Sequence, residues 1–129
     1  MTTPLRGYLR LLAGLTILSA LGQLALPARL GAASAWGFAP GWQREIGFWN
    51  VAMYLVIAGT IRANDPVAGW TVALALVLLQ LLAATNHASA AIQNHATLNT
   101  VMSAVNYGCA MFGTLALRAR LSPADIKAG

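Results

Sequence analysis

Residues 66–117 decide the fold of this chain, and they read PVAGWTVALALVLLQLLAATNHASAAIQNHATLNTVMSAVNYGCAMFGTLAL. No Asp, Glu, Lys or Arg lies between Asp65 and Arg118, and about half of the residues between them are Leu, Ala or Val. The hydrocarbon core of a bilayer is about 30 Å thick, and roughly 20 apolar helical residues cross it. The uncharged stretch is too long for one such helix, so it predicts two membrane helices joined by a turn.

The composition of the whole chain supports the same interpretation. Of the 129 residues, 58% are hydrophobic and 9% are charged, whereas about a quarter of the residues in a typical soluble protein are charged. The net charge is +5, but the eight basic residues flank apolar stretches, which is typical of topology signals rather than of a nucleic-acid-binding surface. We therefore expect one integral membrane domain over residues 1–129, surrounded by the lipid bilayer and without a nucleic-acid partner.

Two further apolar stretches precede Asp65. The first follows Arg10 and ends before Pro27, a pattern shared by secretory signal peptides and first membrane helices. Its length and the lack of a small-residue cleavage site favour a membrane helix. The second stretch lies between Glu45 and Arg62. The predicted fold is an all-α, antiparallel bundle of four transmembrane helices, with expected bounds of 8–26, 46–62, 67–86 and 97–118.

Two connections are expected on the outer side of the membrane. Residues 27–45 are rich in Gly, Ala and Pro and contain Trp36 and Trp42, and Trp beside apolar spans prefers the headgroup region. We expect this loop to lie along the membrane interface, with or without a short helix. Residues 86–97 are polar but uncharged and are expected to form the second outer turn.

The basic residues predict the orientation in the membrane. Only Arg29 and Arg44 lie in the connections expected on the outer side. Six basic residues fall on the other side, namely Arg6, Arg10, Arg62, Arg118, Arg120 and Lys127. Because cytoplasmic loops are enriched in Lys and Arg, we expect a multi-pass protein of the cell (inner) membrane with both termini in the cytoplasm.

Each predicted helix carries a stripe of polar and small residues, mostly in its outer half. A side-chain amide in hydrocarbon needs a hydrogen-bond partner, so these stripes should face one another. The amides then either hold the helices together or line a ligand pocket at the outer end. On the last helix the stripe begins at His95 if the helix starts early enough to include it. The candidate ligand-binding residues are Gln23, Glu45, Asn50, Tyr54, Gln80, His87, His95, Asn99 and Asn106.

Glu45, His87 and His95 are titratable groups near the outer end that could ligate a metal or relay a proton. The two histidines are eight residues apart across an expected turn, which is no standard metal spacing, and neither a thiolate nor a second carboxylate completes a set. In the other interpretation, Glu45 charges the start of the second helix and the histidines lie in interfacial water. A small transporter or metal-handling protein is therefore the alternative function, and a membrane enzyme is the third, because no nucleophile motif is evident.

Residues 44–50, with the sequence REIGFWN, lead from the Trp-rich loop into the second predicted helix. With the four-span layout, this segment resembles small bacterial four-helix membrane proteins of the DoxX-like type, some of which resemble accessory subunits of membrane redox complexes. A basic residue expected late in the first helix is replaced here by Gln23. The resemblance implies no catalytic residue.

Short helices rich in Ala and Gly, with almost no mass outside the membrane, suit lateral packing against other membrane proteins. The leading hypothesis is therefore a non-catalytic accessory subunit that packs against partner membrane proteins or further copies of itself. It would hold a small ligand, a lipid or a quinone at its outer end. A quinone and a metal are the cofactors considered, and the sequence requires neither.

Overall fold

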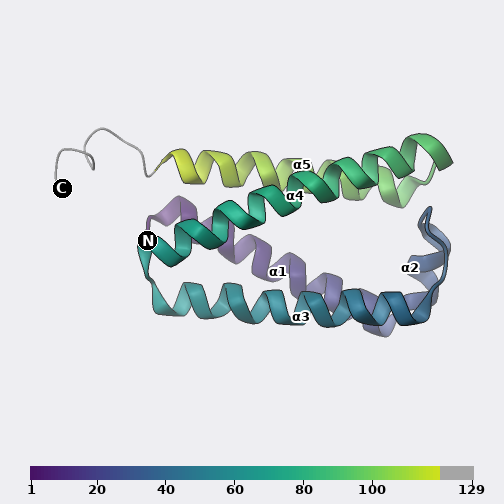
Figure 1. Cartoon of the computed structure of the whole chain (residues 1–129), viewed down its shortest axis with the longest axis horizontal. Coiled ribbons are helices and arrows are strands. Elements are labelled where there is room, and N and C mark those ends of the chain that lie inside the picture. The colour runs from purple at the N-terminus through teal and green to yellow at the C-terminus, as the bar shows by residue number, and fades with distance from the viewer. Residues whose placement is uncertain (120–129) are drawn as a thin grey trace.

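The computed structural model describes residues 1–119, and Arg120 and Lys127, which contribute to the predicted orientation, lie outside the described residues. The described chain is all-helical, as predicted, with no strand in residues 1–119. Four of its helices are long and apolar enough to cross a membrane, and the fifth, α2, is a short helix. The helices are α1 (Thr3–Ala25), α2 (Pro27–Ala33), α3 (Pro40–Ala63), α4 (Pro66–Asn94) and α5 (Thr97–Arg118) (Figure 1).

Proline and left-handed residues set the helix boundaries. Pro27, Pro40 and Pro66 each stand at the first position of a helix, where the fixed φ of proline suits the helix and its missing N–H is not needed. Asn64 and His95 adopt left-handed conformations, with φ of 54° and 52°, and they end α3 and α4. The long helices are therefore joined by very short turns at both of these points.

The third long helix continues beyond the bound that the sequence suggested. Residues 86–94 were expected to belong to a turn, but they extend α4 by more than two turns to Asn94. This segment is polar, but it contains no Gly or Pro, and its side chains form hydrogen bonds within the helix. Gln93 Nε2 donates to Ser89 Oγ at 3.1 Å, and Asn94 Nδ2 donates to the carbonyl of Ala90 at 3.1 Å. Polarity alone therefore does not end the helix.

The second long helix also differs from its expected bounds, because α3 begins at Pro40 and not near residue 46. The expected loop over 27–45 thus contains α2 and the first turn and a half of α3. The last long helix begins after His95. This residue is exposed in the turn before α5 and does not begin the polar stripe of that helix. The rest of that stripe is buried as expected, and it comprises Asn99, Ser103, Asn106, Ala110 and Gly113.

The long helices pack as two pairs, α1 with α3 and α4 with α5, and contact between the pairs is much sparser. Figure 1 shows the pairs close together near the N-terminus and apart toward α2. The apolar core lies at the N-terminal end, where Leu5, Tyr8 and Leu9 of α1 are buried against α4 and α5. The two pairs therefore form a wedge that is closed at this end.

Gly113 explains how closely the helices approach at the closed end. A Cβ atom at this position would lie 2.5 Å from Tyr8 Cζ and 2.5 Å from Val77 Cγ2, which is closer than atoms can approach. The rings of Tyr8 and Phe112 also pack nearly perpendicular to each other, with ring centroids 5.9 Å apart. A larger residue at position 113 would have to displace the side chains of Tyr8 and Val77, so glycine here allows α1, α4 and α5 to pack closely around one point.

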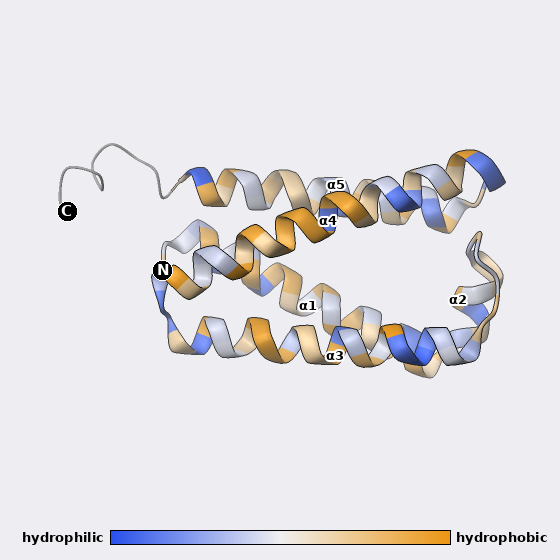
Figure 2. Ribbon diagram, in the orientation of Figure 1, coloured by the Kyte–Doolittle hydropathy of each residue, from blue (hydrophilic) through white to orange (hydrophobic). Residues whose placement is uncertain are grey.

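Hydrophobic residues predominate in the middle of the long helices, and hydrophilic residues gather nearer their ends (Figure 2). Arg6 and Asn64 lie at the closed end, where the Arg6 guanidinium donates a hydrogen bond to Asn64 Oδ1. Trp36, which is 51% exposed, lies near the other end, beyond α2. We call the end that holds α2 and the α4–α5 turn the open end.

Candidate functional site

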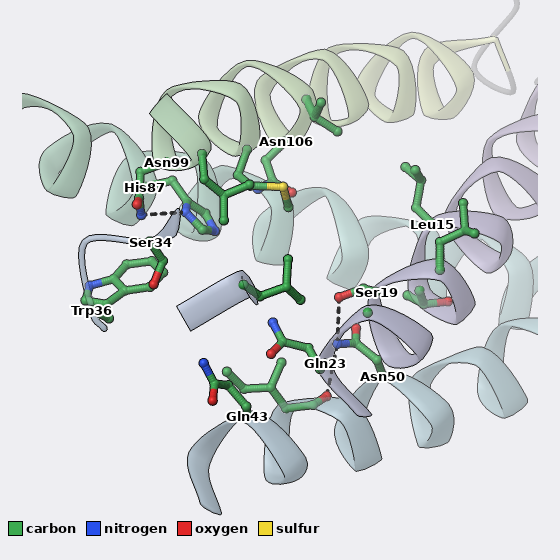
Figure 3. A pocket seen from close by; sticks show the side chains of 18 of the residues that line it. Leu15, Ser19, Gln23, Ser34, Trp36, Gln43, Asn50, His87, Asn99 and Asn106 are labelled. Atoms are coloured by element: carbon green, nitrogen blue, oxygen red, sulfur yellow. Dashed lines mark hydrogen bonds between the residues drawn. The ribbon is translucent and has the colours of Figure 1, made fainter. Parts of the chain in front are cut away.

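A cavity of about 480 Å³ lies between the two helix pairs, toward the open end. This volume is within the range of roughly 300–1,000 Å³ that small-molecule sites occupy. In Figure 3, Gln23, Gln43 and Asn50 lie on one side of the space, and His87 and Asn99 lie on the other. Within residues 1–119, no Asp, Glu, Lys or Arg lines this cavity.

Six of the nine candidate site residues line the cavity, and they come from all four long helices. They are Gln23 of α1, Asn50 of α3, Gln80 and His87 of α4, and Asn99 and Asn106 of α5. The helical spacing in the sequence, which put the polar stripes on facing surfaces, thus places these six side chains around one space. Their role in binding a ligand stays a prediction.

The other three candidates lie elsewhere. Glu45 is exposed and lines a shallow hollow on the outside of α3 with Phe48 and Trp49. It is five residues before Asn50, and this spacing turns its side chain by about 140° away from the cavity face. Tyr54 is half-buried on α3 without lining the cavity, and His95 is exposed in the α4–α5 turn.

The structure does not assemble the metal set considered from the sequence. Of Glu45, His87 and His95, only His87 lines the cavity. In the part of the chain that the structure describes, no group of three or more His, Cys, Asp or Glu side chains could hold a metal ion. The extension of α4 to Asn94 explains the separation, because it places His95 about two helical turns beyond His87.

Asn99 connects the loop before α3 to α4. Its side chain is fully buried, its Oδ1 accepts a hydrogen bond from the backbone N–H of Ala35 at 2.8 Å, and its Nδ2 lies 3.2 Å from His87 Nδ1. Because Ala35 can only donate, it orients the amide so that Nδ2 donates to His87. His87 Nδ1 is then an acceptor, and the imidazole is neutral with its proton on Nε2.

Trp36 covers the other side of this network. Its ring centroid lies 4.9 Å from that of His87, with the ring planes tilted by 53°. Gly31 permits the turn that brings the loop here, since a Cβ atom on it would lie 2.6 Å from Phe38 Cα and 2.7 Å from Gln43 Nε2. The segment that contains α2 therefore covers the cavity at the open end.

Two other polar residues hold the helices within each pair. Asn50 Nδ2 donates to Ser19 Oγ at 3.1 Å and to the carbonyl of Ile46 at 3.0 Å, which joins α3 to α1. Ser103 Oγ donates to the carbonyl of Ala84 at 3.0 Å, which joins α5 to α4. These contacts support the structural interpretation of the polar stripes for these two residues.

Three glutamines have unused hydrogen-bonding capacity at the cavity. The Oε1 atoms of Gln23, Gln43 and Gln80 are shielded from solvent and have no hydrogen-bond partner among the described residues. The Gln43 side chain is only 6% exposed. Nearly all buried polar groups in proteins have partners, and the broad terminal torsion of glutamine allows each amide to turn toward the cavity, where water or a ligand can bond to it.

Gln43 is a buried amide of the cavity that sequence reasoning missed. It fell inside the expected loop, where no helical face could be assigned to it. The signal was Pro40, which suits the first position of a helix. With α3 starting there, Gln43 precedes Asn50 by seven residues and shares its face.

Two apolar residues that line the cavity also have large exposed fractions. Leu18 of α1 and Val105 of α5 both line it, and they are 65% and 40% exposed. An apolar molecule in contact with these side chains would therefore lie against the lining of the cavity.

Comparison of the chain with models of protein families found no match. Comparisons with curated proteins and with solved structures also found none. The resemblance to DoxX-like proteins is therefore neither supported nor contradicted, and any function assigned to the chain depends on the described residues alone.

Proposed function

We propose that the chain is a non-catalytic integral membrane protein whose cavity binds a small lipid-soluble ligand, a lipid or a quinone. The four long helices form an antiparallel transmembrane bundle in the cell (inner) membrane, with both termini in the cytoplasm. Hydropathy supports this placement, as do large apolar side chains on the outside, such as Leu82 and Ile92, which are 70% and 76% exposed. Water would disfavour these side chains, whereas acyl chains would not.

The observation that carries the ligand proposal is the set of three unpartnered glutamine amides in an uncharged cavity. The exposure of Leu18 and Val105, two apolar lining residues, supports a ligand that arrives through the lipid. His87 is the only His, Cys, Asp or Glu among the described lining residues, and its Nδ1 is engaged by Asn99. This arrangement offers no nucleophile with an adjacent base, which supports a binding role over catalysis.

The test is whether the cavity retains a small molecule through purification. Full-length protein is purified in mild detergent, and the bound lipids and quinones are extracted and quantified by mass spectrometry. Val105→Trp adds an indole at a position that lines the cavity, whereas Val101→Trp, one turn earlier on α5, adds the same ring at a 52% exposed position outside the cavity. We expect a near-stoichiometric molecule in the wild type and in Val101→Trp that is lost in Val105→Trp. Equal content in all three proteins, or none in the wild type, would contradict the proposal.

The accessory-subunit part of the proposal is tested separately. The described residues are almost entirely helical, with only short connections outside the four long helices, which suits lateral packing against other membrane proteins or further copies of the chain. We expect cross-linking in native membranes, before detergent is added, to join the chain to a membrane partner or to itself. A chain that stays uncross-linked, and that purifies as a stable monomer, would contradict an accessory role.

A further inference from the structure

A short chain of hydrogen bonds connects the covering loop, residues 34–39 between α2 and α3, to α4 and α5. The backbone N–H of Ala35 donates to Asn99 Oδ1 at 2.8 Å, and Asn99 Nδ2 donates to His87 Nδ1 across 3.2 Å. Within residues 1–119, the bond of Ala35 is the only hydrogen bond that joins the covering loop to either helix. The Asn99 side chain is fully buried, so the loop depends on one amide that bulk water does not reach.

This chain of bonds fits only a neutral imidazole. A protonated His87 carries a hydrogen on both ring nitrogens, so its Nδ1–H faces the Nδ2 hydrogens of Asn99, and both groups are donors. Turning the Asn99 amide over gives its oxygen to His87 but leaves its nitrogen facing the N–H of Ala35. In either orientation of the amide, protonation of His87 therefore removes one of the two bonds.

The charge on the ring decides which bond is lost. A hydrogen bond from a charged donor is roughly twice as strong as one between neutral groups. The amide oxygen of Asn99 therefore turns to the imidazolium, and the N–H of Ala35 loses its acceptor. The covering loop is then left without a hydrogen bond to α4 or α5.

No described carboxylate lies beside His87 to stabilise the protonated ring. The other titratable side chains of α2, α3, α5 and the α4–α5 turn that lie toward the open end do not line the cavity: Arg29, Arg44, Glu45, Tyr54, His95 and Tyr107. Those of α1 lie toward the closed end. The hydroxyl of Tyr107 lies 3.3 Å from that of Thr85, two residues before His87.

Trp36 is the group of the covering loop that attracts an imidazolium. Its ring centroid lies 4.9 Å from that of His87, but the ring planes are tilted by 53° and the indole is 51% exposed. A cation–π contact at an exposed site stabilises less than an unsatisfied buried hydrogen-bonding group destabilises. The closed arrangement therefore favours the neutral ring, and adding a proton favours release of the loop.

We propose that Asn99 and His87 form a proton-sensitive latch, which holds the covering loop over the cavity while His87 is neutral and releases it when the ring is protonated. This proposal rests on the proposed function, because it assigns a regulation to the same cavity. The loop itself can be observed without any ligand.

The first test measures the covering loop in delipidated, full-length protein in mild detergent. Hydrogen exchange of residues 34–37 is followed by mass spectrometry at about pH 5 and pH 8, the range over which histidine changes its charge. Each rate is divided by the intrinsic rate of an unstructured chain at that pH. We expect this relative rate to be at least about tenfold higher at the lower pH, with the closed half of α1 unchanged. Equal relative rates at the two pH values would overturn the latch.

Variants identify the titrating group. His87→Gln removes the titration but keeps an acceptor for Asn99 Nδ2, so it should abolish the effect of pH. His95→Gln is the matched control, because His95 is the other histidine and is exposed in the α4–α5 turn, and this variant should retain the effect. An effect that persists in His87→Gln, or that disappears in His95→Gln, would assign the titration elsewhere and overturn the proposal.

Asn99→Asp tests the role of the amide. A carboxylate can accept from the N–H of Ala35 and from the imidazolium together, so the conflict between donors disappears. We expect residues 34–37 in this variant to stay protected at the lower pH. Exchange that accelerates as much as in the wild type would overturn the role given to Asn99.

A second measurement separates the latch from the proposed function. The molecule that co-purifies at the higher pH is counted again after washing at the lower pH, and it should be lost from the wild type but retained by His87→Gln. Faster exchange at the lower pH in protein that holds no molecule at either pH would overturn the ligand cavity and leave the latch in place. A bound molecule together with exchange that does not depend on pH would overturn the latch alone.

Discussion

Asn99 donates a hydrogen bond from Nδ2 to His87 Nδ1 at 3.2 Å, and this pair fixes the position of the loop that covers the cavity. The amide oxygen, Oδ1, accepts a hydrogen bond from the N–H of Ala35 at 2.8 Å. One buried side chain therefore joins α5 to α4 and to the segment before α3. The bond to Ala35 runs from the α4–α5 pair to the loop between α2 and α3, at the end where the two helix pairs are farthest apart (Figures 1 and 3).

Asn99→Leu should release this loop. The substitution leaves the Ala35 N–H and His87 Nδ1 without partners, which costs about 1–3 kcal/mol for each buried group left unsatisfied. We expect amide hydrogen exchange at residues 34–37 to accelerate at least tenfold, while exchange in the closed half of α1 is unchanged. Asn94→Leu is the control, because the Asn94 amide bonds only within α4. Equal exchange in both variants would show that Asn99 does not hold the loop.

Asn50 and Ser19 should behave as one interacting pair. The interhelical hydrogen bond of 3.1 Å joins α3 to α1, and such bonds within membranes contribute about 0.6–2 kcal/mol. We expect Asn50→Leu and Ser19→Ala each to lower the free energy of unfolding in detergent by about 1 kcal/mol. The double variant should lose less than the sum. Additive losses would mean that the two side chains do not interact.

Gly113→Ala should loosen the closed end. The added methyl group overlaps Tyr8 and Val77, and overpacking of this kind costs roughly 1–3 kcal/mol. Gly108→Ala, on the same helix, has open space around the new methyl group and should be neutral or slightly stabilising. Thermal unfolding of the two purified variants checks the difference. A loss at position 108 equal to that at 113 would refute the packing explanation.

Single cysteines should reveal the orientation of the helices. In a Cys109→Ala background, Thr3→Cys and Ala63→Cys lie at the closed end, and Ala39→Cys and Thr97→Cys lie at the open end; all four positions are exposed. If the chain spans the membrane as proposed, a membrane-impermeant maleimide added to intact cells labels only the second pair. Labelling of the first pair from outside would reverse the orientation, and labelling of all four would argue against a membrane-spanning fold.

The sequence predicts the long helices well because their main signal is local. Absence of charge over a long apolar stretch needs no knowledge of the neighbours, and it identified four helices able to cross a membrane. The ends of the helices were harder to place. Polar residues near 86–94 resembled a turn, yet a backbone without Gly or Pro continues as helix until His95 adopts a left-handed conformation.

In the candidate site, too, residues within regular helices were predicted better than residues near helix ends. Residues on a regular helical face, such as Asn50 and Asn106, were brought to one cavity by periodicity alone. Gln43 and His95 were misplaced because each depends on where a helix begins or ends. The contact of Ala35 with Asn99 joins residues 64 positions apart, and no pattern within one segment encodes such a pairing.

The two helix pairs converge on the packing around Gly113, and Val77, which packs against this glycine, lies one helical turn before Gln80 on α4. A small rotation of one helix pair against the other at this point would move the far ends of the helices by a larger distance. Crowding at Gly113 would therefore widen or narrow the cavity. Substitutions beside Tyr8 should consequently change the affinity of the cavity for a ligand without contacting that ligand. If the helices span a membrane as proposed, a change of bilayer thickness that tilts them should have the same effect.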